Sequence, residues 1–190
     1  MEGDAISRIL PLEAPYAPEV GAQLERMMPA GVPPIALFRM FVRNLPMATA
    51  MWEWGGYELS KRLSLSMRER EIVIDRTTAR CGAEYEWGVH VVSFAERVDL
   101  GKEQIHSLTH GDATDTCWTD GRERLLIRAV DALHDHSDID DALWVELKRH
   151  FTDAELLDLI AMCGWYHAIS FLARATRLPS ERGAPRFTDV

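Results

Sequence analysis

The chain has 190 residues, 47% of them hydrophobic and 27% charged, which is the composition of one globular domain with a core large enough to fold without disulfide or metal staples. Its formal net charge of −9 and the scatter of its basic residues argue against a nucleic-acid partner, because phosphate binding requires clustered lysine and arginine. The acidic, proline-broken first residues do not resemble a signal peptide, and no apolar run reaches the roughly 20 residues of a membrane span, so we expect a cytoplasmic location and no membrane partner.

Cysteine usage bounds the kinds of site that the chain can carry. The three cysteines, Cys81, Cys117 and Cys163, are widely spaced and form no C-x-x-C pair. An odd number of distant cysteines argues against a disulfide scaffold and against a structural zinc site. We therefore expect neither a metal nor another cofactor.

The first segments combine proline breaks with short helices. Residues 1–30 are expected to form an N-terminal arm or extension, irregular up to about residue 15 because of its prolines. A short helix is expected within residues 18–28. The amphipathic stretch 33–45 follows a double proline, and Pro34 suits the first turn of a helix.

The next helix, residues 46–63, contains a glycine pair and is followed by a strong start signal. Gly55 and Gly56 are expected to interrupt this helix, because glycine weakens a helix and lets another backbone come close. Ser66 and Glu69 then have the spacing of a capping box, in which each side chain bonds the other residue's backbone N–H.

The centre of the chain is expected to be helical as well. The run 71–81 is apolar enough for a buried helix, and although its β-branched residues leave a strand possible, its length and its cap favour the helix. A second helix, 84–98, is ended by residues 99–102. A short helix at 103–108 and a loop at 109–121 follow.

The C-terminal third is strongly periodic. Residues 122–136 place their apolar side chains on one face of a helix, and residues 139–151 and 152–176 are expected to form two more helices. Thr152 and Glu155 repeat the capping-box spacing.

No segment shows a persuasive strand alternation or hairpin turn, so the sequence predicts an all-α fold. We divide the chain into an arm or extension at 1–30, a helical domain at 31–178 and a C-terminal tail at 179–190. The tail is expected to be extended because proline and glycine punctuate it.

Glu86 and His90 are the first candidate site. They lie four residues apart, so their side chains are neighbours on one helix face. A carboxylate beside an imidazole favours the protonated histidine and can orient it, which makes a usable acid/base pair. The alternative is an ordinary surface pair or a histidine held in the core.

Glu71 is the second candidate, because it enters an otherwise apolar helix face. A buried glutamate must be paired or neutralised, and burial favours its protonated form, as a proton donor or relay requires. The alternative is a salt bridge to Arg76 or to another helix.

The remaining chemical groups are expected to be structural. Cys81 has no second thiol near it in sequence, so a dithiol redox cycle is not evident and burial in the core is the simpler role. Cys163 and His167 share a helix face in an apolar helix, which favours core packing. His134 and His136 suggest a metal cluster, but they diverge on a helix and no third ligand follows, so they are expected to serve a helix C-terminus.

The stretch 68–91, REREIVIDRTTARCGAEYEWGVHV, resembles the core motif of the carboxymuconolactone decarboxylase and alkylhydroperoxidase D superfamily. That motif is a helix opening with a glutamate, a turn, and a second helix carrying C-x-x-C-x-x-x-H. Glu71 matches the proton-relay glutamate and His90 the motif histidine. Ala83 and Glu86 fall where the peroxidase branch has its two cysteines. The sequence EYEW followed by His90 is typical of the decarboxylase-like branch.

The resemblance spans about residues 30–178 and implies an alkylhydroperoxidase D-like helical bundle. It also implies assembly into homo-oligomers, commonly trimers or hexamers, with the site near subunit contacts. It does not imply dithiol peroxidase activity, because Ala83 and Glu86 carry no sulfur. Cys81 stands two positions before the first motif cysteine, which on a helix turns its side chain by roughly 200 degrees.

Our leading hypothesis is therefore a cofactor-free lyase or proton-transfer enzyme acting on a small oxo-acid or lactone. His90 is the candidate acid/base, Glu86 orients it and Glu71 relays or holds a proton. Trp87 is also a candidate for core packing. The candidate substrate-binding residues are Arg76, Tyr85 and Trp87.

Two alternatives stay open. In the first, Cys81 is a lone peroxidatic thiol, which requires a low thiol pKa. In the second, the protein is a non-catalytic helical oligomer that binds a small apolar ligand. A polar pocket around Glu71, Glu86 and His90 would favour the enzyme over this binding protein.

Overall fold

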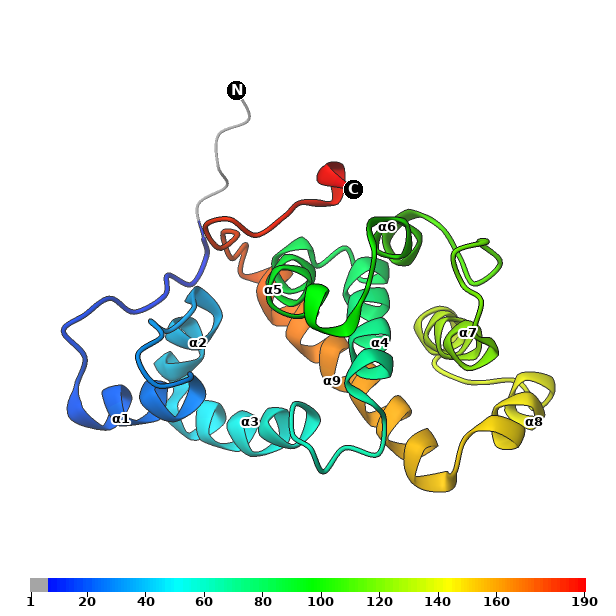
Figure 1. Ribbon diagram of the computed structural model, residues 1–190. Helices are drawn as coiled ribbons and strands as arrows, with labels where there is room; N and C mark the ends of the chain where they lie inside the picture. Colours follow the sequence, from blue (N-terminus) through cyan, green and yellow to red (C-terminus); the bar gives the residue numbers. More distant parts are fainter. Residues whose placement is uncertain (1–6) are drawn as a thin grey trace.

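The computed structural model describes residues 7–190, and this part of the chain is all-α, as the sequence predicts (Figure 1). Residues 1–6, the start of the expected arm, lie outside the described residues. Short 3-10 turns stand at Val42–Asn44, Glu96–Val98 and Phe187–Asp189. The α-helices are α1 (Pro18–Met27), α2 (Ala36–Phe41), α3 (Leu45–Glu58), α4 (Met67–Arg80), α5 (Glu84–Phe94), α6 (Lys102–His110), α7 (Gly121–His136), α8 (Asp141–His150) and α9 (Asp153–Ala175).

Both capping boxes predicted from the sequence are present, and they begin the two central helices. The Ser66 side chain accepts a hydrogen bond from the Glu69 N–H at 3.2 Å, and Glu69 accepts one from the Ser66 N–H at 2.9 Å. Thr152 and Glu155 make the same reciprocal pair at the start of α9. Each cap satisfies backbone donors that a helix start leaves free, so α4 forms as a helix and not as a strand.

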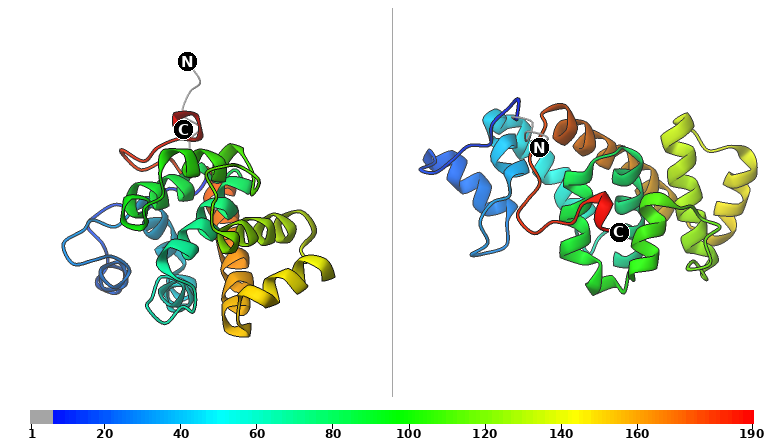
Figure 2. Two further views of the ribbon diagram at one scale, coloured as in Figure 1. Left: turned by 45° about the vertical axis from the view of Figure 1, so that its right-hand side comes forward. Right: turned by 90° about the horizontal axis from the view of Figure 1, so that it is seen from above.

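Helix α4 is the centre of the fold. Nine consecutive residues, Arg70 to Thr78, are buried, and α4 packs against α5, α6, α7 and α9. Figure 2 shows α1–α3 at one end of the molecule and α7 and α8 at the other, with α4, α5, α6 and α9 between them. Polar side chains on α4 are therefore enclosed, and each needs a partner on a neighbouring helix.

Helix α9 is long and apolar enough to cross a membrane by length and composition alone, with a mean hydropathy of 1.5. More than half of that apolar window, 56%, is buried inside the fold. A core helix passes the same test, and α9 packs against α3, α4, α5 and α7 as such a helix does.

The N-terminal helices and the C-terminal tail complete the fold around α5. Leu24 and Met27 of α1 are buried, and α1 packs against α2 and α3. The tail returns past α5, where Phe187 contacts Trp87 and a Cβ at Gly88 would lie 2.6 Å from the Pro185 carbonyl oxygen. Gly88 is therefore required for this close approach.

Three local expectations differ from the structure. Pro34 precedes α2, whose N-cap is Ile35, and so does not occupy its first turn. Helix α3 continues through Gly55 and Gly56, and the atoms nearest to a Cβ at Gly55 would belong to the Trp165 side chain, at 3.0 Å, and not to another backbone. Cys81 is the C-cap of α4 and not part of α5, so its offset from the motif is set by a turn and not by helical rotation.

Candidate active site

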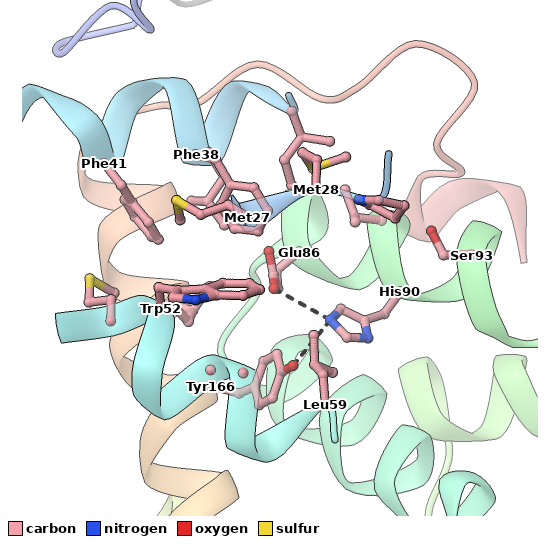
Figure 3. A pocket seen from close by; sticks show the side chains of 18 of the residues that line it. Met27, Met28, Phe38, Phe41, Trp52, Leu59, Glu86, His90, Ser93 and Tyr166 are labelled. Carbon is pink, nitrogen blue, oxygen red and sulfur yellow. Dashed lines mark hydrogen bonds and ion pairs between the residues drawn. The ribbon is translucent and has the colours of Figure 1, made fainter. Parts of the chain in front are cut away.

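A cavity of about 710 Å³ lies between the N-terminal helices and helices α5 and α9 (Figure 3). Three polar side chains of its wall, Glu86, His90 and Tyr166, lie next to one another. The rest of the wall is mostly apolar, so charges on this wall interact in a medium with little water. Its apolar residues include Met27, Met28, Phe38, Phe41, Met51, Trp52, Leu59 and Trp165.

Glu71 and His90 form a buried pair between α4 and α5. The His90 Nδ1–H donates to Glu71 Oε2 at 2.8 Å. The other oxygen of Glu71 accepts from the Arg70 Nε–H at 2.7 Å. Glu71 is fully buried and His90 is 4% exposed, so this carboxylate pairs with Arg70 and His90 and not with Arg76.

The second ring nitrogen of His90 faces two further groups. Its Nε2 lies 3.2 Å from the Tyr166 hydroxyl oxygen and 3.5 Å from Glu86 Oε1. Glu86 stands one helical turn before His90 on α5, the spacing from which the sequence predicts contact. The other carboxylate oxygen, Glu86 Oε2, is buried and has no hydrogen-bond partner among the described residues.

Electrostatics make His90 a cation at neutral pH. Burial alone lowers the pKa of His90, but the charges and hydrogen bonds of Glu71 and Glu86 outweigh it and raise the pKa to about 10. Both ring nitrogens then carry protons, and the Nε2–H can donate to the Tyr166 oxygen. Burial, followed by the same two carboxylates, raises the pKa of Tyr166 well above its usual value, so its hydroxyl keeps a proton.

The arrangement is a chain of donors that ends at the cavity. His90 holds a proton on Nε2, Tyr166 accepts a hydrogen bond from it, and the Tyr166 hydroxyl proton remains free for a ligand. Asp75 lies one turn after Glu71 on α4, and burial, followed by the charge of Glu71, raises the pKa of Asp75 well above its usual value. Such a chain can stabilise a developing anion and deliver a proton to it.

The structure places the three predicted substrate-binding residues away from the cavity. Arg76 donates to both oxygens of Asp131 at 2.8 Å and to backbone carbonyls at the end of α6. The Tyr85 hydroxyl donates to Glu181 in the tail at 2.6 Å and accepts from a backbone N–H. Trp87 is fully buried against Phe187. Glu71, Glu86 and His90 are thus brought together, whereas Arg76, Tyr85 and Trp87 are not.

Two solved structures have the same arrangement of helices. An uncharacterized peroxidase-related protein from Silicibacter sp. TM1040 superposes with a TM-score of 0.80 at 16% sequence identity, over 98% of this chain and 97% of that chain. A protein of unknown function from Agrobacterium tumefaciens, described as a candidate AhpD antioxidant-defence protein, superposes with a TM-score of 0.66 at 19% identity, over 74% of this chain and 95% of that chain. No protein-family model and no curated protein sequence matches the chain.

The chain has the alkylhydroperoxidase D-like fold. The resemblance predicted from residues 68–91 is thereby confirmed at the level of the fold. Within this fold, Ala83 is the N-cap of α5 and is fully buried, and Glu86 lies in the first turn of the same helix. The two motif positions that carry sulfur in the peroxidase branch therefore hold a methyl group and a carboxylate here.

Sequence reasoning missed several parts of the site in this alkylhydroperoxidase D-like fold. Tyr166 sits in the helix stretch 159–172, whose apolarity indicates core packing, and nothing in its spacing relates it to His90. Arg70 is the residue before Glu71, and adjacent residues of a helix do not normally face each other. Helices α1–α3 also form part of the cavity wall, and no sequence motif in these helices predicts that role.

Metal-ligand spacing occurs at a different place in the fold. Within residues 7–190, three side chains of types that bind metals lie close enough together to share an ion. They are Cys81, His134 and His167. None of these lines the cavity. The cavity wall itself presents a hydrogen-bonded acid/base group.

Proposed function

We propose that the protein is a cofactor-free acid/base enzyme, a carboxy-lyase or proton-transfer enzyme acting on a small oxo-acid or lactone. One observation carries the proposal: Glu86 Oε2 is buried without a partner, beside the His90 cation and the Tyr166 hydroxyl, on the wall of an apolar cavity. An unsatisfied buried oxygen costs stability. Glu58 Oε2 and Asp75 Oδ1 are also buried without a partner among the described residues, but of these three carboxylates only Glu86 lines the cavity. An oxygen left free at a cavity suits a proton or hydroxyl of a ligand.

The chemistry follows from the positions of the donors. Loss of carbon dioxide breaks a carbon–carbon bond and leaves its electron pair on an enolate-like anion. The Tyr166 hydroxyl and the His90 cation behind it stabilise that negative charge. Tyr166 then delivers its proton to carbon and takes one from His90 Nε2, and His90 regains a proton from solvent.

Glu71 and Glu86 have separate roles in this scheme. Glu71 holds the Nδ1 side of His90 and keeps the ring protonated and oriented. Glu86 approaches Nε2 with Oε1 and can accept a substrate hydroxyl, or take an acidic carbon-bound proton, with Oε2. Glu86, with His90 and Tyr166, can therefore also move a proton between two carbon atoms of a lactone without decarboxylation.

The size and charge of the cavity favour a small anionic substrate. A volume of about 710 Å³ falls in the range of small-molecule sites. Arg26 of α1 and Arg97, just after α5, both line the cavity and both are exposed, so they mark its solvent side. Two guanidinium groups there attract a carboxylate toward an otherwise apolar interior.

The peroxidase alternative has less support. Cys81 does not line the cavity and is 6% exposed. Burial raises the pKa of the Cys81 thiol, although Ser170, Arg174 and Arg80 oppose the shift. A peroxidatic cysteine requires an accessible thiolate and therefore a lowered pKa.

Non-catalytic binding of a small apolar ligand is the second candidate, because methionine and aromatic side chains form most of the cavity wall. The two candidates differ in what happens to a bound acid. A binding protein releases the acid unchanged. The enzyme exchanges a carbon-bound proton of the acid or replaces its carboxyl group with a proton.

Incubation in deuterium oxide separates them. Small β-oxo-acids and carboxylated lactones are incubated with the protein in deuterium oxide and followed by proton NMR. The enzyme gives products with deuterium at the carbon that lost carbon dioxide, or solvent exchange at the carbon next to the carbonyl. His90→Gln is expected to slow either process by about 10²- to 10⁴-fold, while His106→Gln, at an exposed site, leaves it unchanged. Full turnover in His90→Gln would overturn the assignment.

We also propose that the protein forms a homo-oligomer. One face of α9 is exposed and apolar along its whole length, although α9 is otherwise a core helix. Exposed apolar stripes of this kind mark association surfaces. The exposed positions recur every three or four residues and are Leu157, Ile160, Gly164, Ala168, Phe171 and Ala175.

A further inference from the structure

Three ligand-type side chains from three helices converge away from the cavity. Cys81 caps the end of α4, His134 lies in the last turn of α7, and His167 is in the middle of α9. Cys81 Sγ is 3.9 Å from His134 Nδ1, and that nitrogen is 3.0 Å from His167 Nε2. The three ligand atoms all lie within 4.8 Å of one another.

We propose that Cys81, His134 and His167 form a metal site for Zn²⁺ or a similar divalent transition-metal ion. Tetrahedral zinc bonded to sulfur and to two imidazole nitrogens places its ligand atoms about 3.3–3.6 Å apart, since the Zn–S bond is about 2.3 Å and the Zn–N bonds about 2.0–2.1 Å. The observed separations bracket this range, so small side-chain rotations bring the three atoms to one ion. One thiolate and two imidazoles are a ligand set that zinc accepts.

Hydrogen bonds behind the ligands already hold the tautomer that coordination requires. The His167 Nδ1–H donates to the Cys163 carbonyl oxygen at 2.7 Å, which leaves the lone pair of Nε2 directed at the cluster. A backbone carbonyl on the far nitrogen is the usual support of a metal-bound histidine. His134 Nδ1 reaches the same point from α7.

A buried hydroxyl beside the thiol supplies an independent observation. Ser170 is fully buried on α9 and its hydroxyl oxygen has no hydrogen-bond partner among the described residues. The side chain near it is that of Cys81. A hydroxyl in this place can donate to a metal-bound thiolate, which carries more negative charge than a thiol.

The charges around the cluster permit a cation. Arg80, the last residue of α4, is paired with Asp131 and Asp135 of α7. Arg174 points its guanidinium at the Cys81 carbonyl oxygen, 2.5 Å away. When the ion binds, Cys81 loses its thiol proton to solvent.

The site leaves a coordination position free. Three protein ligands complete three corners of a tetrahedron, and water takes the fourth. His134 and His167 are half-buried, so solvent reaches the cluster from their side. The ion would join the end of α4 to α7 and α9, next to the Gly82 turn, where φ is +63°, that leads into α5. The metal is therefore expected to stabilise the helix that carries His90 without touching the cavity.

The competing explanation is a simple hydrogen bond, in which His134 Nδ1–H donates to His167 Nε2 and Cys81 only packs nearby. The two explanations differ in their response to metal. A hydrogen-bonded pair shows no thiolate-to-metal charge transfer and gains no stability when zinc is added.

The experiment is a cobalt and zinc titration of the full chain, first freed of metal by chelator and dialysis. We expect one Co²⁺ per chain, with visible bands of a tetrahedral ion and a near-ultraviolet thiolate-to-cobalt band, and displacement by one Zn²⁺. Saturating Zn²⁺ should raise the Tm. Cys81→Ser should abolish the thiolate band, and His134→Gln and His167→Gln should each weaken zinc binding by about 100-fold or more.

Matched variants make the result decisive. Cys117→Ser and His136→Gln carry the same substitutions at residues outside the cluster and should bind as the wild type does. Circular dichroism checks each fold, and if Cys81→Ser unfolds, the half-buried His134→Gln carries the test. Absence of a thiolate band in the wild type, or zinc affinity unchanged in His134→Gln, would overturn the site.

Discussion

Nδ1 of His90 lies 2.8 Å from Oε2 of Glu71, and this pair joins α5 to α4 inside the fold. The carboxylates of Glu71 and Glu86 raise the pKa of His90 to about 10 in spite of its burial. In an unfolded chain the same imidazole titrates near 6.5. The pair therefore ties the charge on the candidate acid to the stability of the protein.

Stability is expected to fall as pH rises above neutrality. A histidine whose pKa is raised by folding stabilises the fold fully below about pH 6.5, and that contribution is lost as pH rises through about 10. Within this window each pH unit should remove up to about 1.4 kcal/mol from the free energy of unfolding. Urea unfolding between pH 7 and pH 10 measures the slope. His90→Gln should flatten it and the exposed His106→Gln should not; equal slopes in both variants would contradict the pair's role.

Removing the Tyr166 hydroxyl should impair the chemistry more than the fold. Tyr166→Phe keeps the buried ring but removes the oxygen 3.2 Å from His90 Nε2. If Tyr166 passes the proton, kcat should fall by about 10²- to 10³-fold with little change in KM, while stability changes by about 1–2 kcal/mol. Tyr57→Phe is the matched control, since its hydroxyl bonds Asp158 and does not line the cavity. A kcat equal to that of the control would remove Tyr166 from the mechanism.

The acid/base pair could be predicted from the sequence because its parts are local. Glu86 and His90 are one helical turn apart, and the Ser66 cap fixes where α4 starts and hence which face Glu71 enters. Helix boundaries were predictable for the same reason: caps, prolines and apolar periodicity are short-range signals.

The rest of the site depends on contacts between distant segments. Tyr166 reaches His90 from 76 residues away, and the cavity wall unites helices from both halves of the chain. Arg76 was a reasonable carboxylate ligand by type, but packing of α4 on α7 gives it Asp131. His134 lacked a third ligand in sequence because its neighbours, Cys81 and His167, lie on other helices.

Two adjacent glycines in α3 should respond in opposite ways to alanine. A Cβ at Gly55 would stand 3.0 Å from the Trp165 indole, whereas a Cβ at Gly56 meets nothing within 4 Å. Gly55→Ala should therefore cost about 1–3 kcal/mol through overpacking. Gly56→Ala should stabilise the helix by about 0.4–1 kcal/mol. Thermal unfolding of both variants tests this prediction. A rise in Tm for Gly55→Ala would show that the Trp165 side chain moves aside without loss of stability.

An anionic substrate should depend on the arginines at the solvent side of the cavity. Arg97 lines the cavity and is exposed, so its charge attracts a carboxylate before chemistry begins. Arg97→Gln is expected to raise KM for an anionic substrate by about 2- to 5-fold and to leave kcat unchanged. The effect should shrink in high salt and be absent for the exposed Arg149→Gln. A loss of kcat instead would place Arg97 in the chemistry.

The apolar face of α9 should govern assembly. Phe171 is 64% exposed and Leu157 is 69% exposed on a helix whose other faces pack in the core. If this face joins copies of the chain, Phe171→Asp should convert a trimer or hexamer to monomers at micromolar concentration in sedimentation velocity, because a charge would be buried at the contact. Val145→Asp is the control, since Val145 is also exposed and apolar but lies on α8. A wild-type protein that sediments as a monomer, or an oligomer that tolerates Phe171→Asp, would assign this exposed face another role.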